Sequence, residues 1–349
     1  MPDIIGFVYC GHSPSELARS ILQYSIVYQV PVVAIPFSNL IDHFHGKPLI
    51  AEYWNDQCIA FRESSLPSIL DSEYNSFSEK ALHQNDAGFL DWLKSKNAQL
   101  LRQFSCKKEA IPQLLLPTEL YPYAIPTWNV STYPELLRYL SCIKDAILKP
   151  CSGRKGKGVS KLFRQNDGSI ILKDKNGKRI LNEAVFSEYL SSVQEQNLGN
   201  MFLVQPCLDF TLDEDHAVDF RLLRHRGSSG QWEEVATYAR IGASSLVSNV
   251  SQGGFIADAK ETLQTISGDH AETLYEEIMT IGDKLPRVIQ NCGKETVFCL
   301  GLDIAIDRKT MQPFILEANT YPGTKFHARQ LAEKRVQYYK YILTKAKSN

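Results

Sequence analysis

Apolar and polar positions at the start of the chain follow a strand–helix–strand pattern. Two short apolar runs, residues 4–9 and 30–35, are typical of buried strands. Between them Ser13 is placed as an N-cap residue, Pro14 suits the first helical position, and Glu16 completes a capping box. Because a helix between two buried strands forms a right-handed crossover, this pattern predicts a parallel sheet.

The next hundred residues carry weaker signals. Residues 36–90 show no clear period, whereas the apolar spacing over 89–104 predicts a helix. Five prolines in segment 111–134 disfavour regular elements and predict an extended connection between domains. We therefore place the first domain boundary near residue 108.

The second half of the chain has more regular patterns, in which apolar runs bounded by turn residues predict strands. An amphipathic pattern predicts one long helix over residues 270–291. The expected strands are 146–149, 169–173, 201–205, 218–223, 234–241, 297–307 and 313–318. The chain thus combines an α/β beginning with a strand-rich α+β remainder.

Composition and charge narrow the function classes. The chain has 38 Lys+Arg against 39 Asp+Glu, a formal net charge of −1, so no electrostatic argument favours nucleic acid or an anionic membrane as a partner. The eight cysteines include no C-x-x-C pair, which predicts reduced thiols. Because the sequence shows neither a signal-peptide pattern nor an apolar stretch of about 20 residues, we expect a cytoplasmic protein.

A glycine-rich basic loop follows a short apolar strand that ends in Lys149. Glycines allow backbone N–H groups to approach phosphate oxygens closely, and cationic side chains balance the phosphate charge. The loop lacks the Lys-Ser/Thr ending of a Walker A sequence, and a solvated basic hairpin is the alternative interpretation. Its candidate phosphate-binding residues are Ser152, Gly153, Arg154, Lys155, Gly156 and Gly158.

A strand pair near the C-terminus carries the strongest chemical signal. If its hairpin is centred on Thr310, Asp303 lies directly across from Glu317, and Asn319 shares the face of Glu317. Two opposed carboxylates repel each other unless a cation or a proton lies between them. Oxygen donors of this kind suit Mg²⁺, which keeps waters and phosphate oxygens as its other ligands.

The same register predicts the apolar pairs of this hairpin. Ile304 would face Leu316, and Ile306 would face Phe314, on the opposite side of the sheet. A slip of one residue would move every side chain to the other face and remove the carboxylate pair. Two carboxylates on a solvated sheet face are the alternative interpretation.

These motifs, taken in order, resemble the ATP-grasp superfamily over about residues 90–330. The runs that carry the resemblance are I-L-K-P-C-S-G-R-K-G-K-G, V-Q-P-C-L, D-F-R-L-L, Y-A-R-I-G, S-N-V-S-Q-G-G and the Asp…E-A-N pair. In detail they look most like the YheC/YheD branch, the so-called endospore coat-associated proteins. The resemblance implies an ATP-grasp fold with an N-terminal α/β domain (1–108), a lid subdomain with the glycine-rich loop (109–205) and a C-terminal antiparallel-sheet subdomain that binds metal (206–349).

The resemblance also implies roles in nucleotide binding. Lys149 would contact the phosphates and the adenine edge, and the glycine-rich loop would close over the β- and γ-phosphates. Gln205, Cys207 and Leu208 would form the adenine hinge. An earlier nucleotide lysine would lie on the helix near 90–104, with Lys94 and Lys96 as the two candidates.

Further implied roles concern the transferred phosphoryl group. Arg221 and Arg240 would reach it, with Asn249 assisting, although a plain salt bridge is the alternative for Arg221. One or two Mg²⁺ ions, with Mn²⁺ as a substitute, would be held by Asp303, Glu317 and Asn319. In one respect the chain departs from some peptide ligases of the superfamily, because Gly301 stands where they carry an arginine.

The activity implied is an ATP- and Mg²⁺-dependent ligase that joins a carboxylate to an amine or a thiol through an acyl-phosphate. Its partners would be a small-molecule or peptide carboxylate and an amine, without nucleic acid or membrane, and a homodimer is compatible with this function. The alternatives are an ATP-grasp kinase and a spore-associated structural protein that retains nucleotide binding. The basic tail with Lys334, Lys340, Lys345 and Lys347 is expected to form a solvated helix face.

Overall fold

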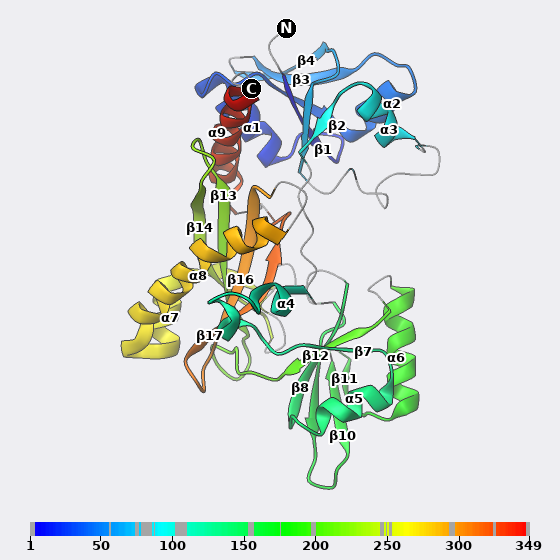
Figure 1. The fold of residues 1–349 in the computed structure, drawn as a ribbon, viewed down its shortest axis with the longest axis vertical. Helices are drawn as coiled ribbons and strands as arrows, with labels where there is room; N and C mark the ends of the chain where they lie inside the picture. The colour runs from blue at the N-terminus through cyan, green and yellow to red at the C-terminus, as the bar shows by residue number, and fades with distance from the viewer. Residues whose placement is uncertain are drawn as a thin grey trace.

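Three β-sheets follow one another along the long axis of the molecule (Figure 1). The structure is a computed structural model. It describes residues 4–346 except 56, 74–76, 78–85, 87, 102–109, 153–156, 175, 197–199, 245–247, 249, 251–252, 293–296 and 324–325. The expected boundary at 108 lies outside the described residues.

The N-terminal sheet has the order β4-β3-β2-β1-β5-β6, and β1 pairs in parallel with both β2 and β5. This arrangement confirms the predicted crossover. The strands are β1 (Ile5–Tyr9), β2 (Val32–Pro36), β3 (Ile50–Asn55), β4 (Cys58–Glu63), β5 (Ile69–Ser72) and β6 (Gln99–Leu100), and the helices are α1 (Glu16–Val27), α2 (Phe37–Phe44) and α3 (Phe89–Ser95).

Two local predictions in this region are wrong. The N-cap of α1 is Ser15 rather than Ser13: Ser15 has extended backbone, so the helix begins after it, and its hydroxyl accepts a hydrogen bond from the Ala18 N–H at 3.1 Å. The helix expected over 89–104 ends at Ser95, because Asn97 adopts a left-handed φ of 57° and the chain then joins the sheet as β6.

The proline-rich segment 111–134 is also more regular than predicted. It contains α4 (Ile111–Leu115), the 3-10 helix η3 (Tyr121–Tyr123) and β7 (Trp128–Val130). Proline lies in the first turn of both α4 and η3, where a missing N–H breaks no helical hydrogen bond. The prolines therefore start these elements instead of preventing them.

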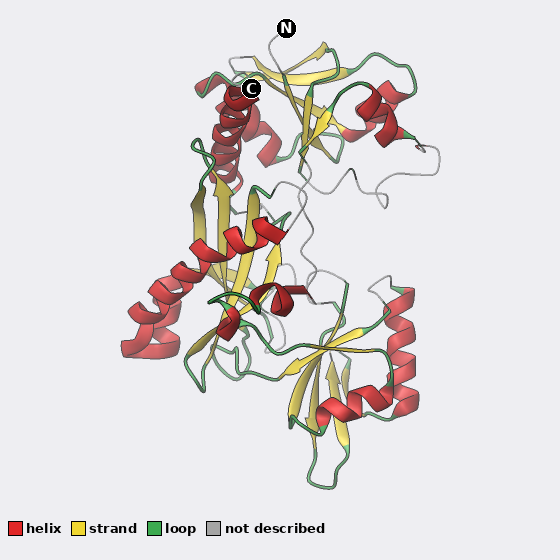
Figure 2. Ribbon diagram, viewed as in Figure 1, coloured by secondary structure: helices red, strands yellow, loops and turns green. Residues whose placement is uncertain are grey.

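The second sheet, named here the lid sheet, lies within residues 128–206. It is antiparallel, with the order β11-β10-β9-β8-β12-β7. Two helices lie along one face of this sheet (Figure 2), and an apolar core joins them to it. Its further strands are β8 (Asp145–Pro150), β9 (Ser160–Arg164), β10 (Ile170–Asp174), β11 (Gly177–Ile180) and β12 (Phe202–Pro206), and its helices are α5 (Tyr133–Leu140) and α6 (Glu183–Glu195). The strands predicted from residue 146 to residue 205 are confirmed within two residues.

The central sheet has the order β15-β14-β13-β16-β17 and packs its apolar face on the long helix α8. Its strands are β13 (Val218–Arg226), β14 (Trp232–Ile241), β15 (Phe255–Ala257), β16 (Cys299–Asp307) and β17 (Gln312–Asn319). The accompanying helices are α7 (Ala259–Ser267), η5 (Gly268–His270) and α8 (Ala271–Cys292). The predicted long helix is therefore confirmed as α8.

The last helix, α9 (Ala328–Ala346), returns to the N-terminal part of the chain and lies beside α1 (Figure 1). Its buried Arg335 and Tyr339 both bind Asp71 of β5, at 3.0 Å and 2.5 Å. Lys340 and Lys345 are exposed, as expected for the basic face, but Lys334 is half-buried and pairs with Glu233; Lys347 lies outside the described residues. The sequence pattern missed the buried face of this helix.

The helices and cysteines of the described residues bear on two further expectations. None of the helices formed by the described residues is both long enough and apolar enough to cross a bilayer. Six cysteines are free thiols, which confirms the prediction of reduced thiols for these positions; they are Cys10, Cys58, Cys142, Cys151, Cys207 and Cys299.

Candidate functional site

Charged side chains gather on the face of the central sheet that points away from α8. In the strand register Arg221 lies between Tyr238 and Asp303, and Asp219 lies across from Arg240. Because neighbouring strands keep directly opposed residues on one face, these five side chains project from the same side of the sheet. The alternate residues, such as Phe220 and Leu222, belong to the apolar core under α8.

The charges in this face are paired in an alternating chain. Arg221 donates to both carboxylate oxygens of Asp303, from Nε at 2.5 Å and from Nη2 at 3.1 Å. Nη2 of Arg240 lies 2.8 Å from the same carboxylate. Arg240 also donates two hydrogen bonds of 2.6 Å to Asp219, which further accepts from the hydroxyl of Ser248. Because Asp303 and Arg221 are buried, these contacts are shielded from water.

Two members of this network, Asp303 and Arg240, have shifted pKa values. Burial by itself would raise the pKa of Asp303, but the guanidinium groups of Arg221 and Arg240 outweigh burial and hold that pKa below its usual range. Burial would likewise lower the pKa of Arg240, and the carboxylates of Asp219 and Asp303 raise it well above its usual value. Arg240 is therefore a fixed cation at neutral pH.

Gly301 makes room for this arrangement. A Cβ atom at this position would lie 2.8 Å from Cβ of Pro322 and 3.1 Å from Nη1 of Arg221. The guanidinium of Arg221 therefore lies over the backbone of Gly301, where a larger residue would displace it.

The metal candidates lie at the edge of the same face. Asp303 pairs with Glu317 and Gly301 pairs with Asn319. The predicted position of the two carboxylates, directly across from each other on adjacent strands, is therefore confirmed. Among the residues that the structure describes, no group of three or more His, Cys, Asp or Glu side chains is placed to hold a metal ion. The candidate set contains only two carboxylates, and Asn319 supplies its third oxygen donor.

The apolar pairs predicted for this hairpin are wrong by one residue. Ile304 pairs with Ile315 instead of Leu316, and Ile306 pairs with Pro313 instead of Phe314. The turn leaves Asp307 opposite Gln312, so the hairpin is not centred on residue 310. A β-bulge between Asp303 and Ile304 inserts one extra residue on β17 and restores the alignment of the carboxylates.

The lid sheet presents a second group of predicted residues. Lys149 lies on β8, where buried and half-buried residues alternate, and the buried ones pack under α5 and α6. Ile147 pairs with Gln205 on one side and with Lys161 on the other, so these residues and Lys149 share the face opposite the helices. The amide of Gln205 donates to the Thr127 hydroxyl at 2.7 Å.

The predicted hinge follows β12. The N–H of Cys207 donates to the carbonyl of Asp145 at 3.0 Å, and the N–H of Leu208 donates to the carbonyl of Pro206 at 3.1 Å. Both N–H groups thus already have acceptors within the chain. Burial raises the pKa of the Cys207 thiol, which disfavours a reactive thiolate at this point.

Several predicted residues lie outside the described residues, namely Gly153, Arg154, Lys155, Gly156 and Asn249. At the ends of the glycine-rich loop, Ser152 is exposed and Gly158 has a left-handed φ of 72°. The carbonyl of Gly158 accepts a hydrogen bond from the Tyr189 hydroxyl at 2.8 Å, which anchors the end of the loop to α6. Lys94 is exposed on α3 and pairs with Asp91, and Lys96 is exposed beside it.

Sequence reasoning assigned no role to four residues of these two faces. Asp219 and Tyr238 complete the charged face, and Lys161 joins Lys149 on the lid. His327, just before α9, packs its ring on Tyr238 with 4.8 Å between ring centroids. The signal for Asp219 was present, because in D-F-R it stands two residues before Arg221, the spacing of one strand face.

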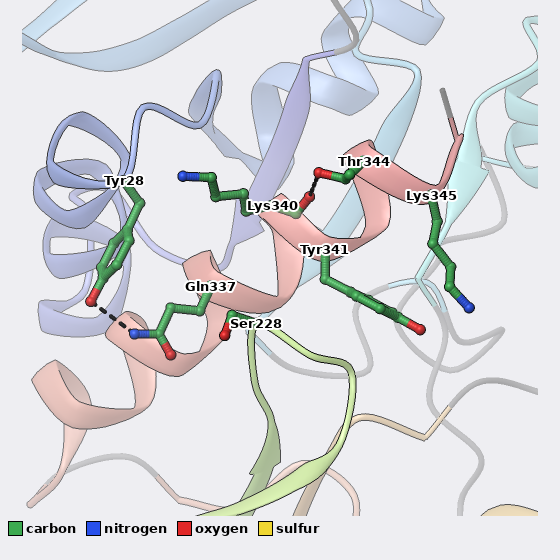
Figure 3. Close-up of a pocket in the computed structure, with 7 residues that line it drawn as sticks. All are labelled: Tyr28, Ser228, Gln337, Lys340, Tyr341, Thr344 and Lys345. Carbon is green, nitrogen blue, oxygen red and sulfur yellow. Dashed lines mark hydrogen bonds between the residues drawn. The ribbon is translucent and has the colours of Figure 1, made fainter. Parts of the chain in front are cut away.

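A separate cavity of about 480 Å³ lies between α1, the β13–β14 turn and α9 (Figure 3). Its lining residues are Tyr28, Ser228, Gln337, Lys340, Tyr341, Thr344 and Lys345. No predicted site residue lines it. Tyr28 accepts a hydrogen bond from Gln337 at 2.8 Å, so part of the wall is a contact between α1 and α9.

Comparison with known proteins gives a family and a relative. A family model described as YheC/D like ATP-grasp matches residues 98–348. The Endospore coat-associated protein YheC of Bacillus subtilis (strain 168) is 29% identical over 257 residues, which cover 72% of this chain and 69% of the relative.

Solved structures share the fold at low identity. D-cycloserine synthetase DcsG superposes with a TM-score of 0.56 at 12% identity, covering 96% of this chain and 99% of that one. N5-Carboxyaminoimidazole synthetase from Staphylococcus aureus, complexed with ADP, gives a TM-score of 0.52 at 9% identity, covering 97% of this chain and 77% of that one. Together with the family match, these similarities confirm the predicted ATP-grasp fold.

Proposed function

Because the chain belongs to the YheC/D-like ATP-grasp family, we propose that it is an ATP- and Mg²⁺-dependent ligase that joins a carboxylic acid to an amine or a thiol. The observation that carries this proposal is the charged face of the central sheet. There Asp219 and Asp303 bind the guanidinium groups of Arg221 and Arg240, and Glu317 lies across from Asp303. Such a face offers fixed positive charge beside oxygen donors for a cation, as a metal-bound polyphosphate requires.

The proposed reaction has two steps. A carboxylate oxygen of the acid attacks the γ-phosphorus of ATP, the bond to the β–γ bridging oxygen breaks, and ADP leaves. The amine nitrogen or thiol sulfur then attacks the acyl-phosphate carbon, phosphate leaves with the bonding electrons, and the nucleophile loses a proton. Arg221 and Arg240 would neutralise the charge on the transferred group, with Asn249 assisting, since phosphoryl transfer depends on positioning and charge stabilisation.

The residues at the sheet edge fit a magnesium ion by their chemistry. Asp303, Glu317 and Asn319 supply hard oxygen donors, and three carboxylates on this face outnumber the two guanidinium groups. Because both arginines already bind Asp303, we assign the larger share of metal binding to Glu317 and Asn319. When bound, Mg²⁺ or Mn²⁺ would withdraw charge from the phosphate oxygens. One or two ions are compatible with this donor set.

Nucleotide binding is assigned to the lid. Lys149 would contact the phosphates, and the loop from Ser152 to Gly158, including Gly153, Arg154, Lys155 and Gly156, would close over them. Since the N–H groups of Cys207 and Leu208 already have acceptors, the carbonyl oxygens of this hinge would receive the adenine amino group. We retain the division into parts 1–108, 109–205 and 206–349 as part of this proposal.

The deciding experiment measures ADP release from Mg·ATP in the presence of panels of acids and amines. A ligase releases ADP only when both co-substrates are present, whereas a stable phosphorylated acid formed without an amine would support the kinase alternative. Absence of Mg·ATP binding by calorimetry would exclude both enzymes and favour a structural protein. The name of the relative YheC also leads us to propose spore association, which immunolocalisation in sporulating cells would test.

A further inference from the structure

Three lysines lie directly opposite one another on the open face of the lid sheet. Lys173 of β10 pairs in register with Lys161 of β9 on one side and with Lys178 of β11 on the other. Like charges that face each other on adjacent strands destabilise a sheet. No ion pair formed by the described residues involves any of these three lysines, whereas the neighbouring Arg179 pairs with Asp174.

A row of apolar side chains runs beside this lysine row. Ile171 pairs with Phe163 and with Ile180, two residues along the strands from the lysines, so both rows share one face. Ile180 is 62% exposed, although it is a large aliphatic side chain. A cavity of about 530 Å³ lies over this part of the sheet. It is lined by Phe163, Gln165, Ile171, Lys173, Lys178, Arg179 and Ile180.

We propose that this face of the lid, named here the lysine ladder (Lys161, Lys173 and Lys178 with Phe163, Ile171 and Ile180), binds an extended acidic peptide segment that also carries apolar side chains. A carboxylate-bearing ligand relieves the repulsion between the lysines, and the apolar row requires a ligand with hydrophobic groups as well. Inorganic polyphosphate would satisfy only the lysines, and the apolar row offers a single ring, that of Phe163, so successive nucleobases could not stack along it.

The dimensions of the ladder suit an extended chain. Neighbouring strands lie about 4.8 Å apart, so the three lysines span roughly 10 Å, and alternate side chains of an extended peptide repeat about every 6.8 Å. A peptide with alternating acidic and apolar residues can therefore direct its acidic side to the lysines and its apolar side to the second row.

The direct test is fluorescence anisotropy with the full chain and a labelled octapeptide of alternating glutamate and leucine. We expect saturable binding that weakens as salt is raised, because the lysines are exposed to solvent on one side. The double variant K173E/K178E should lose about tenfold or more in affinity, and I180S should lose about threefold. The matched control K144E/K340E changes two exposed lysines outside the ladder by the same charge and should bind as the unchanged chain does.

A second readout separates a binding role from a structural one. Lys173→Glu places a carboxylate between two lysines, so it should raise the midpoint of thermal unfolding of the lid by about 2–4 °C while it weakens peptide binding. A lysine kept only for stability would lower the midpoint when changed. Mg·ATP binding, measured in parallel, should persist in K173E/K178E, so failure of the ladder and failure of the proposed ligase are distinguishable.

Three outcomes would overturn the proposal. The first is equal peptide affinity for K173E/K178E and K144E/K340E. The second is tighter binding of tripolyphosphate or of an eight-nucleotide thymidine oligomer than of the peptide, competing at the same face. The third is equal binding of an octapeptide of alternating glutamate and serine, which would show that the apolar row contributes nothing.

Discussion

The charged face of the central sheet and the lysine ladder of the lid both place charged residues directly opposite each other on adjacent strands, but they differ in sign and burial. In the central sheet Asp219 meets Arg240 and Arg221 meets Asp303, and three of these four residues are buried. In the lid a lysine meets a lysine on each side. The central face therefore has paired charges before a ligand binds, whereas the lysines of the lid need a ligand of opposite charge.

The two regions differ in what neutralises their positive charge. The central face balances its arginines internally, so the geometry for phosphoryl transfer exists before any substrate binds. In the lid, no described carboxylate pairs with Lys161, Lys173 or Lys178. An incoming anion must therefore supply the negative charge that balances them. The first region is preorganised, and the second is a receptor for an outside partner.

Removal of Asp303 should cause the largest effect. Asp303→Ala leaves two largely buried guanidinium groups without their shared carboxylate, and we expect a loss of about 3–5 kcal/mol in the free energy of opening of β13 and β16. Hydrogen exchange of the amides in these strands, followed by mass spectrometry, measures that quantity. The control Asp213→Ala removes an exposed carboxylate paired with His216 and should cost less than about 1 kcal/mol.

The pH dependence of this effect has a defined sign. The folded pKa of Asp303 lies below its usual range, so the stability it contributes is complete above the unfolded value of about 3.9 and is lost as pH falls through the folded value. The stability difference between the unchanged chain and Asp303→Ala should therefore be constant from about pH 5 to 7 and shrink below about pH 4. A difference that stays constant through the acid range would contradict an ionised Asp303.

The next effect concerns Asp219, which positions Arg240. Asp219→Asn keeps the shape but removes the charge that receives two hydrogen bonds from Arg240. We expect kcat for ADP release to fall by about 10–100-fold, while KM for ATP changes by less than about threefold. Asp307→Asn is the control, because Asp307 is also buried in this sheet but binds the Asp209 N–H and the Thr310 hydroxyl. Equal loss of kcat in both variants would reduce Asp219 to a structural residue.

A smaller effect is expected at Gly301. Gly301→Ala places a methyl group 2.8 Å from Cβ of Pro322 and 3.1 Å from Nη1 of Arg221, so one of them must move. We expect a loss of about 1–3 kcal/mol in stability, measured by thermal unfolding, together with slower ADP release. Gly323→Ala is the control, since its Cβ would meet no atom within 4 Å. If both variants behave alike, Gly301 is not needed to seat Arg221.

The strand register of the charged face was accessible from the sequence only in part. A period of two places Asp303 opposite Glu317 only if the hairpin is centred on residue 310, whereas its turn leaves Asp307 opposite Gln312 and a bulge restores the carboxylate pair. The bulge between Asp303 and Ile304 could not be predicted, because it depends on how β16 and β17 twist against their neighbours. The prediction of the carboxylate pair was therefore correct, while the apolar pairs predicted by the same symmetry were wrong.

Contacts between distant parts of the chain could not be predicted either, because they also depend on tertiary packing. Asp303 lies 82 residues from Arg221, and no local pattern indicates that these side chains meet. The position of α9 against α1 likewise depends on tertiary packing that a helical period cannot specify. The lysine ladder was missed because β9 and β11 carry weak strand signals, and its meaning appears only when three strands are aligned.

The smallest effect is the response of the two faces to salt. Raising NaCl from about 0.1 M to 1 M shortens the screening length from about 10 Å to 3 Å and weakens repulsion between exposed charges. In the absence of a ligand, amides of β9, β10 and β11 should therefore exchange more slowly at high salt, by up to about 1 kcal/mol in opening free energy. Lys173→Gln removes the middle charge and should reduce this salt response by about half or more, whereas β13 and β16 should respond equally in both proteins because their charges are buried and paired. A lid that responds to salt no more than the central sheet would mean that its lysines do not repel one another, and the contrast between the two faces would then be one of burial alone.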